Sequence, residues 1–181
     1  LLGVFEGRAA GVAREAAPEG QRPQDVILMG LGRYGLGIAG VLREAGLRVM
    51  GVDFSPEAVR AARAEGHDAV FGDATDPEFL AHLPLSQARW VVLAVPEHDI
   101  GLTREDPRRT LLGTLRDLGY AGRVAVAAHQ ARTAAEMRAA QADLVLMPYR
   151  DAACAAARMI LGEGAPADRV PEPPERQKEF A

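Results

Sequence analysis

The sequence predicts an α/β fold, a single doubly wound sheet of six parallel strands with helices on both faces. Two observations favour it. Short apolar runs alternate with helical patterns from residue 25 to about residue 161. One run, Trp90 to Val95, is apolar at every position, as expected for a central strand covered on both faces. Right-handed crossovers then give the expected strand order 3-2-1-4-5-6.

The first predicted strand, Val26 to Met29, leads directly into a glycine motif. Gly30, Gly32 and Gly35 form the pattern G-x-G-x-x-G, and apolar residues then recur with helical spacing. A glycine motif between a strand and a helix is typical of the Rossmann-type dinucleotide fingerprint. Gly30 permits the tight turn, Gly32 lets a pyrophosphate approach the backbone, and Gly35 allows the helix to pack closely on the strand. The start of the helix then offers N–H groups and a positive dipole end to the phosphates.

The second predicted strand, residues 47 to 52, ends at Asp53, eighteen residues after Gly35. A carboxylate at this position can accept hydrogen bonds from both ribose hydroxyls and repels a 2′-phosphate. The alternative role for Asp53 is a cap for the helix that follows. Its spacing from the glycines favours contact with ribose.

The rest of the chain continues the alternation of helices and strands. The expected elements are a helix from Pro56 to about Glu65 capped by Ser55, a strand from Ala69 to Phe71, a short helix through Leu80 capped by Thr75 or Asp76, the strand from Trp90 to Val95, a helix through Leu118 that Gly119 ends, a strand from Arg123 to Ala128, a helix from Thr133 to Ala140, a strand from Leu144 to Met147, and a last alanine-rich helix from Asp151 to Leu161.

Three segments are expected along the chain. Residues 1–24 are interpreted as a lead-in linker, residues 25–161 as the nucleotide-binding domain, and residues 162–181 as a proline-rich polar tail without fixed structure. The chain starts at Leu1, which suggests a fragment of a longer protein. With a formal net charge of −4, nucleic acid is not an expected partner. The one cysteine, Cys154, excludes an internal disulfide and suits a reducing compartment.

Several other residues are candidates for ligand contact, each with an alternative. Arg33 can fold over a phosphate or remain solvated. Asp73, after the third strand, can accept a hydrogen bond from an adenine amino group or cap its own turn. Val95 and Pro96 end the fourth strand at the switch point of the sheet, where they can wall the ligand or belong only to the core.

No catalytic apparatus is evident in the sequence. The four histidines have no metal-ligand spacing, and His98 and His129, just beyond strands four and five, are interpreted as surface residues. No nucleophile–base pair can be assembled, and the sheet leaves no second domain to hold a substrate against a nicotinamide. We therefore expect ligand binding rather than an enzyme. The alternative is an NAD-dependent oxidoreductase fragment that lacks its substrate domain.

The chain resembles the TrkA-N family, the N-terminal nucleotide-binding half of RCK (regulator of potassium conductance) modules, also called KTN domains. Within it, the chain is most similar to the cytoplasmic domain of Kef-type cation:proton antiporters. The matching stretches are residues 30–35, Val52-Asp53, the loop Gly72-Asp73-Ala74-Thr75-Asp76, and Ala142-Asp143 leading to Pro148.

The resemblance implies binding of NAD(H) or of AMP or ATP, and a signal to a membrane cation-transport domain, expected upstream in the same polypeptide. It also implies a homodimer at the cytoplasmic face of the membrane. By motif, it assigns Gly30, Gly32, Arg33 and Gly35 to the phosphate, Asp53 to the ribose, and Asp73 with Ala74 to the adenine. The remaining expected nucleotide-binding residues are Leu31, Tyr34, Phe54, Val95 and Pro96.

The segment after the fourth strand departs from the family. Members often have a small or polar residue there, followed by an acidic residue and an asparagine, whereas this chain has Pro96-Glu97-His98-Asp99 and a long polar stretch through Arg109. The choice between NAD and AMP is therefore open. The last helix, with alanine on nearly every side, is interpreted as a dimer contact, a transporter contact, or a helix packed on the sheet edge.

Overall fold

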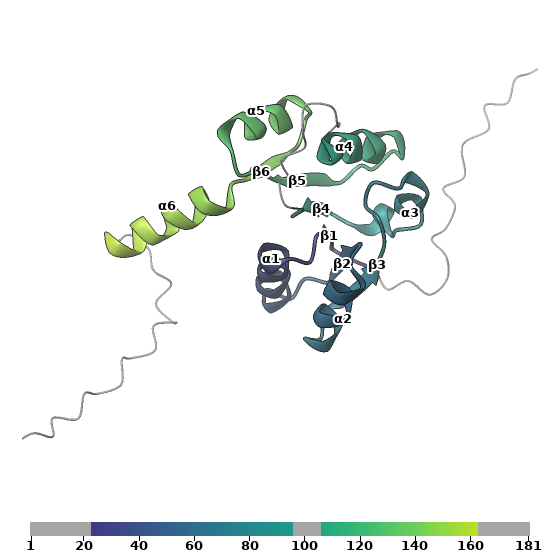
Figure 1. The fold of residues 1–181 in the computed structure, drawn as a ribbon, viewed down its shortest axis with the longest axis horizontal. Coiled ribbons are helices and arrows are strands. Elements are labelled where there is room, and N and C mark those ends of the chain that lie inside the picture. Colours follow the sequence, from purple (N-terminus) through teal and green to yellow (C-terminus); the bar gives the residue numbers. More distant parts are fainter. Residues whose placement is uncertain (1–22, 96–105, 163–181) are drawn as a thin grey trace, which may run out of the picture.

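The computed structural model describes residues 23–95 and 106–162. They form a six-stranded sheet in the order β3-β2-β1-β4-β5-β6, and every neighbouring pair is parallel. The expected fold class and strand order are confirmed (Figure 1). The strands are β1 Val26–Met29, β2 Val49–Asp53, β3 Asp68–Phe71, β4 Trp90–Leu93, β5 Arg123–Ala127 and β6 Leu144–Leu146. The helices are α1 Arg33–Glu44, α2 Pro56–Ala64, α3 Pro77–Ala81, the 3₁₀ turn η1 Leu85–Gln87, α4 Pro107–Asp117, α5 Ala131–Ala139 and α6 Pro148–Ile160.

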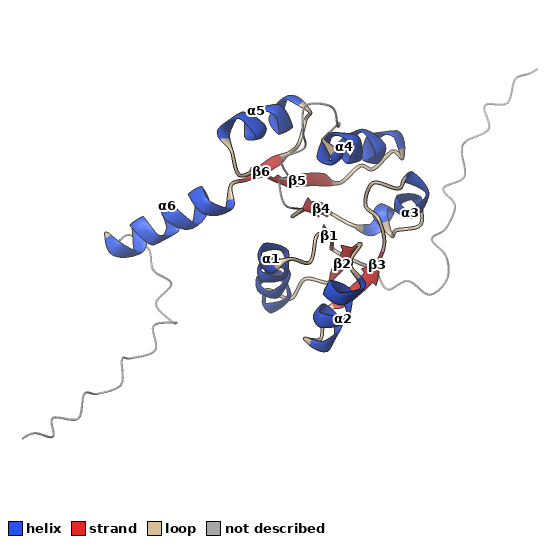
Figure 2. Ribbon diagram, viewed as in Figure 1, coloured by secondary structure: helices blue, strands red, loops and turns tan. Residues whose placement is uncertain are grey.

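Helices cover both faces of the sheet (Figure 2). Successive strand residues point to opposite faces, so each strand contributes to two cores. Ile27 and Met29 of β1 belong to a cluster with buried leucines of α3 and α4 and with Met137 of α5. Val26 and Leu28 belong to a second cluster, with buried side chains of α1 and α2. The fold therefore consists of three layers, with α1 and α2 on one face and α3, α4 and α5 on the other.

Two local motifs set the limits of the helices. The pairs Ser55-Pro56, Asp76-Pro77 and Asp106-Pro107 start α2, α3 and α4, and in each the first side chain accepts a backbone N–H of the first turn. The ends of α1, α2, α4 and α5 have paired hydrogen bonds of the Schellman type. At the end of α1, the Leu47 N–H donates to the Leu42 carbonyl. Leu47 therefore belongs to the end of the helix, and β2 begins at Val49 rather than at residue 47.

The last helix differs from its expected limits. It begins at Pro148 instead of Asp151, because the Asp151 carboxylate reaches back to the Met147 N–H at 2.8 Å and stabilises the first turn from within. In Figure 1 the helix extends away from the rest of the molecule, and its residues from Tyr149 onward are exposed. The expected linker of residues 1–24 and tail of residues 162–181 fall almost entirely outside the described residues. Among the helices of the described part of the chain, none is long and apolar enough to cross a membrane.

Candidate nucleotide-binding site

The turn between β1 and α1 depends on two of its glycines. Gly30 has a φ of +98°, a left-handed conformation that favours glycine, and its N–H donates to the Val52 carbonyl at 2.8 Å. A Cβ at Gly30 would lie 3.0 Å from backbone atoms of Ala94 and Val95, at the end of β4. A Cβ at Gly35 would collide with the Gly30 carbonyl oxygen. The turn therefore packs closely against both the helix that it starts and the neighbouring strand.

The start of α1 is open. A Cβ at Gly32, the N-cap residue, would meet nothing within 4 Å, and no side chain caps the helix. The helices α2, α3 and α4, in contrast, each have a hydroxyl or carboxylate cap. The first N–H groups of a helix lack partners within the helix and carry partial positive charge. The space above Gly32 and these N–H groups fit a phosphate.

Asp53 lies beside this opening, at the end of β2. Its Oδ2 accepts the Leu31 N–H at 2.7 Å, and its Oδ1 accepts the Ser55 N–H at 2.8 Å. The cap of α2 is Ser55, whose hydroxyl oxygen accepts the Ala58 N–H. A carboxylate oxygen can accept two hydrogen bonds, so both oxygens of Asp53 retain an acceptor position for ribose hydroxyls.

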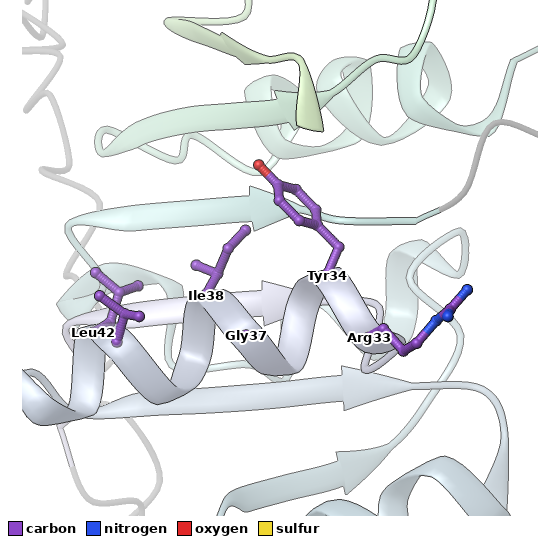
Figure 3. Close-up of a pocket in the computed structure, with 6 residues that line it drawn as sticks. Arg33, Tyr34, Gly37, Ile38 and Leu42 are labelled. Atoms are coloured by element: carbon purple, nitrogen blue, oxygen red, sulfur yellow. The ribbon is translucent and has the colours of Figure 1, made fainter. Parts of the chain in front are cut away.

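The side chains within the glycine motif point in three directions. Leu31 is buried and packs over Gly51, so its side chain belongs to the core. Figure 3 shows Tyr34 rising from α1 on the side of the neighbouring strand, whereas Arg33 extends away past the first turn. Burial raises the pKa of Tyr34, and the Asp151 carboxylate adds to this shift. Arg33 is thus the exposed cation at the start of α1, and Tyr34 lines an apolar groove together with Ile38 and Leu42.

Further expected contact residues follow the ends of β2 and β3. Phe54 comes directly after Asp53 and is exposed. Asp73 caps its own turn: its Oδ1 accepts both the N–H and the hydroxyl of Thr75, at 2.8 and 2.7 Å. Ala74 is half-buried and packs against the core. Asp73 therefore caps its turn, as the alternative role predicted. The exposed Asp73 carboxylate also lies at the same edge of the sheet as Asp53.

Two further expected contacts follow β4. Val95 is half-buried, next to the close approach between Gly30 and the end of β4. Pro96 lies outside the described residues, as does His98. His129, after β5, makes a tilted ring contact with Tyr149, with 5.5 Å between ring centroids. Within residues 23–95 and 106–162, no group of three histidine, cysteine or acidic side chains could hold a metal ion.

One buried ion pair near this edge was not expected from the sequence. Arg108, 4% exposed, donates from Nη2 to Asp106 at 2.6 Å and from Nη1 to the Ala127 carbonyl at 3.1 Å. Burial raises the pKa of Asp106, but the hydrogen bonds and positive charge of Arg108 outweigh this effect, and the pKa is lowered overall. The pair joins the start of α4 to the end of β5. The Asp-Pro signature that starts α4 was visible in the sequence, but the burial of the next residue was not.

Sequence comparisons relate the chain to potassium transport proteins. The TrkA-N domain profile matches residues 26–148. A putative K(+) efflux antiporter KefB from Alkalimonas amylolytica is 32% identical over 88 residues, which cover 49% of this chain and 13% of that protein. The Ktr system potassium uptake protein A from Vibrio alginolyticus is 29% identical over 136 residues, 74% of this chain and 58% of that protein. The chain therefore spans less than two thirds of the length of these relatives.

Solved structures share the fold. The NAD(P)-binding domain of an exopolyphosphatase-related protein from Archaeoglobus fulgidus has 25% identity and a TM-score of 0.66, covering 77% of this chain and 98% of that one. The Kef CTD of Shewanella denitrificans, in an AMP-bound form, has 18% identity and a TM-score of 0.56, covering 76% and 78%. The GsuK channel bound to NAD has 19% identity and a TM-score of 0.59, covering 72% and 22%.

Proposed function

Because this chain belongs to the TrkA-N domain family, we propose that it is a regulatory domain that binds an adenine nucleotide and controls a cation transporter. The proposal rests on one observation above all. The uncapped start of α1 and the open space above Gly32 lie beside the Asp53 carboxylate. This carboxylate is held in place by hydrogen bonds that it accepts from the N–H groups of Leu31 and Ser55. This opening offers N–H donors to a phosphate and carboxylate acceptors to ribose hydroxyls.

The described residues can form a site for adenosine monophosphate, which is one half of a dinucleotide. We assign the phosphate to the backbone at Gly32 and to Arg33, the ribose hydroxyls to Asp53, and the adenine to the exposed residues Phe54 and Asp73. AMP, ATP and NAD(H) all contain this half. Asp53 disfavours NADP, because its carboxylate would face the negative 2′-phosphate. The related Kef domain with AMP and the GsuK channel with NAD support both ligands for this fold.

The proposed role is regulation rather than catalysis. A nucleotide can shift a transporter between two states only by binding one state more tightly than the other. We propose that a cation-transport domain, in the same polypeptide upstream of this chain, is the partner, and that the domain works at the cytoplasmic face of the membrane as a homodimer. The relatives named for K(+) efflux and potassium uptake support this assignment.

The test is a binding panel on the 181-residue chain with NAD, NADH, NADP, AMP, ADP and ATP. Each ligand is first screened by thermal shift, since a ligand that binds the native state raises its melting temperature. Affinities then come from isothermal titration calorimetry. We expect stabilisation by AMP and NAD(H), and binding of NADP at least about tenfold weaker than that of NAD, a difference of about 1.4 kcal/mol.

Two outcomes would contradict the proposal. If none of the six nucleotides raised the melting temperature or gave heat on titration, the chain would be a structural platform and not a nucleotide sensor. If the chain instead oxidised NADH in the presence of a small electrophilic substrate, the oxidoreductase reading would replace the regulatory one.

A further inference from the structure

The helix α5 ends with a glutamine in a backbone conformation that glycine favours. Four other helices, α1, α2, α4 and α6, are each followed by a glycine with a positive φ, at Gly46, Gly66, Gly119 and Gly162. The corresponding residue after α5 is Gln141, with a φ of +66°, and no other non-glycine residue among those described has a positive φ. A Cβ makes this conformation strained, so glycine would stabilise the end of α5 more than glutamine does. Stability therefore does not explain why the chain has a side chain here.

Gln141 lines a hollow between the end of α5 and one side of α4. Figure 1 shows these two helices side by side on one face of the sheet, and the Arg116 Nη2 donates to the Ala140 carbonyl at 3.4 Å. The hollow has a volume of about 440 Å³, which suits a small molecule. It lies on the face of the sheet opposite to α1, whose start forms the candidate nucleotide site. Its lining includes Arg109, Gly113 and Arg116 of α4, and Ala139, Ala140 and Gln141 at the end of α5.

A glycine in the middle of α4 keeps the hollow open. Gly113 lines the hollow, and a Cβ at this position would meet nothing within 4 Å. No contact in the described part of the chain therefore excludes a side chain here, although glycine in a helix interior is less stable than alanine. The methyl group of an alanine would instead project into the hollow. Gly113 and Gln141 thus share a property, since each lowers the stability of the fold and each lies at the same hollow.

The hollow carries positive charge. Arg109 and Arg116 are exposed and lie on the same side of α4 as Gly113, because they are separated from it by four and three residues. Among the described residues that line the hollow, none is acidic. Glu136, the acidic residue of α5, is bound by Arg132 at 2.9 Å. Guanidinium groups bind carboxylate and phosphate oxygens through pairs of hydrogen bonds, so the hollow suits an anion.

The spacing of the two arginines favours a ligand with more than one acidic group. Seven residues of α-helix correspond to a rise of about 10 Å, so Arg109 and Arg116 start about two turns apart. A single carboxylate or phosphate can fill the fork of one guanidinium, whereas two acidic groups on one molecule can bind both. The amide of Gln141 can donate and accept hydrogen bonds, which suits hydroxyl groups between the acidic ones.

We propose that this hollow binds a small organic anion that has at least two carboxylate or phosphate groups. Arg109 and Arg116 each bind one acidic group, the Gln141 amide binds a hydroxyl group of the ligand, and Gly113 allows the ligand to approach the backbone of α4. The anion is a second ligand of this chain, bound on the opposite face of the sheet from the nucleotide. This second site goes beyond the proposed function, and binding of a nucleotide does not enter its test.

The test is isothermal titration calorimetry of the 181-residue chain with four anions at constant ionic strength. Citrate represents compounds with several carboxylates, and fructose 1,6-bisphosphate represents compounds with several phosphates. Acetate and inorganic phosphate, which have one acidic group each, are their respective controls. We expect citrate or fructose 1,6-bisphosphate to bind at least about tenfold more tightly than its control. The tighter of the two shows whether the site is made for carboxylates or for phosphates.

Two arginine variants locate the anion on the chain. Arg109→Met and Arg116→Met each remove one guanidinium, and each should weaken binding of the tighter anion at least about tenfold. Arg138→Met is the matched control, because Arg138 is also exposed near the end of α5 but does not line the hollow. This control should change the affinity by less than about twofold, since mobile ions screen a charge outside the site.

Two further variants separate binding from folding. Gly113→Ala and Gln141→Gly should each raise the melting temperature by about 2–4 °C, because each removes a local cost to stability. The same changes should weaken anion binding at least about fivefold, since alanine fills part of the hollow and glycine removes the amide. Gly40→Ala on α1, where a Cβ also meets nothing, is the control and should raise the melting temperature without changing the affinity. A residue with only a structural role would not change stability and binding in opposite directions.

Three results would overturn the proposal. If neither citrate nor fructose 1,6-bisphosphate gave heat at about 1 mM, the hollow would not be an anion site. If Gly32→Ala abolished binding of the anion and Arg109→Met did not, the anion would occupy the proposed phosphate position at α1 instead. If Arg138→Met weakened binding as much as Arg109→Met, the anion would respond only to the overall charge of the chain.

Discussion

The Asp53 carboxylate accepts the backbone N–H of Leu31, with 2.7 Å between Oδ2 and the nitrogen. This hydrogen bond joins the end of β2 to the glycine turn, two segments that are separated by 22 residues in the sequence. The other oxygen accepts the Ser55 N–H at 2.8 Å. The orientation of the carboxylate is therefore fixed by the protein before any ligand arrives. Such preorganisation reduces the entropy that binding must overcome.

We expect Asp53→Asn to weaken AMP or NAD(H) binding by about 1–3 kcal/mol, the loss typical of hydrogen bonds to a charged group. An asparagine has one acceptor oxygen, so its NH₂ group must face either the Leu31 or the Ser55 N–H. Calorimetric titration measures the affinity. Asp68→Asn, at the distant amino end of β3, is the control and should leave the affinity unchanged. Equal affinities of Asp53→Asn and the unchanged chain would remove Asp53 from the site.

Gly32→Ala should separate binding from folding. The φ of −69° and ψ of 179° at Gly32 suit alanine, and its Cβ would meet nothing within 4 Å. Alanine is a poorer N-cap than glycine, so the free energy of unfolding should fall by no more than about 1 kcal/mol. The methyl group would occupy the space that we assign to phosphate, and nucleotide affinity should fall at least about tenfold. Urea unfolding and titration test the two parts, and unchanged affinity would place the phosphate elsewhere.

Gly35→Ala, unlike Gly32→Ala, should greatly lower the free energy of unfolding. Its Cβ would collide with the Gly30 carbonyl oxygen, and backbone atoms cannot move aside as a flexible side chain can. We expect a loss of at least about 1–3 kcal/mol, as in overpacked cores. Gly40→Ala on the same helix is the matched control, since its Cβ would meet nothing, and it should gain up to about 1 kcal/mol from helix propensity. Similar unfolding midpoints for the two variants would contradict the close packing.

The sequence predicted those features that depend on neighbours along the chain. The alternation of strands and helices, the strand order and the strand–turn–helix context of the glycines all follow from local patterns, and the structure confirms the sheet. The caps at Ser55 and Asp76 are equally local. Because these elements are connected by the usual right-handed crossovers, the strand order could be predicted from the local patterns as well.

Features that depend on distant contacts were not predictable in this way. The hydrogen bond from the Leu31 N–H to the Asp53 carboxylate joins the glycine turn to the end of β2. No residue pattern indicates that this N–H is bonded within the protein and is not available to a phosphate. Arg108 is buried, and its guanidinium donates to the Ala127 carbonyl at the end of β5, which is distant in the sequence. The exposure of α6 depends on where this helix lies relative to the sheet (Figure 1), which its own residues do not indicate. To predict any of these features, one must know how the helices and strands lie relative to one another.

The pH dependence of stability should include a contribution from Asp25. Arg48 donates side-chain and backbone hydrogen bonds to this carboxylate, and they lower the pKa of Asp25 from 3.8 to about 2. A lowered pKa means that the ionised form stabilises the folded state. The contribution is therefore complete above about pH 4 and disappears as the pH falls towards 2. Asp25→Asn should be less stable than the unchanged chain at pH 6, with urea midpoints that converge near pH 2.

Salt provides the control for this electrostatic effect. The Arg48 side chain is 53% exposed, so mobile ions reach the pair. The difference between the two proteins at pH 6 should therefore narrow in 1 M NaCl. A difference in midpoint that stayed constant from pH 6 to pH 2 would show that Asp25 acts through packing and not through its charge.

Arg108→Met should strongly destabilise the protein because it leaves the Asp106 carboxylate without its cation. Methionine retains most of the apolar volume, so the loss reports mainly the hydrogen bonds to Asp106 and to the Ala127 carbonyl. Removing one partner of a buried ion pair typically costs about 3–5 kcal/mol, and the 19% exposure of the Asp106 side chain favours the lower end of that range. Arg109→Met, at the adjacent exposed position, should change stability by less than about 0.5 kcal/mol.

A double-variant cycle decides whether the pair itself is responsible. Once Arg108 has become methionine, the additional change Asp106→Asn removes the unpaired charge but retains an oxygen that can cap α4. The double variant should therefore be more stable than the sum of the two single losses predicts, with a coupling free energy of about 1–3 kcal/mol in urea unfolding. Strict additivity would show that Arg108 stabilises the end of β5 independently of Asp106. In that case the Ala127 carbonyl, and not the carboxylate, would be its important partner.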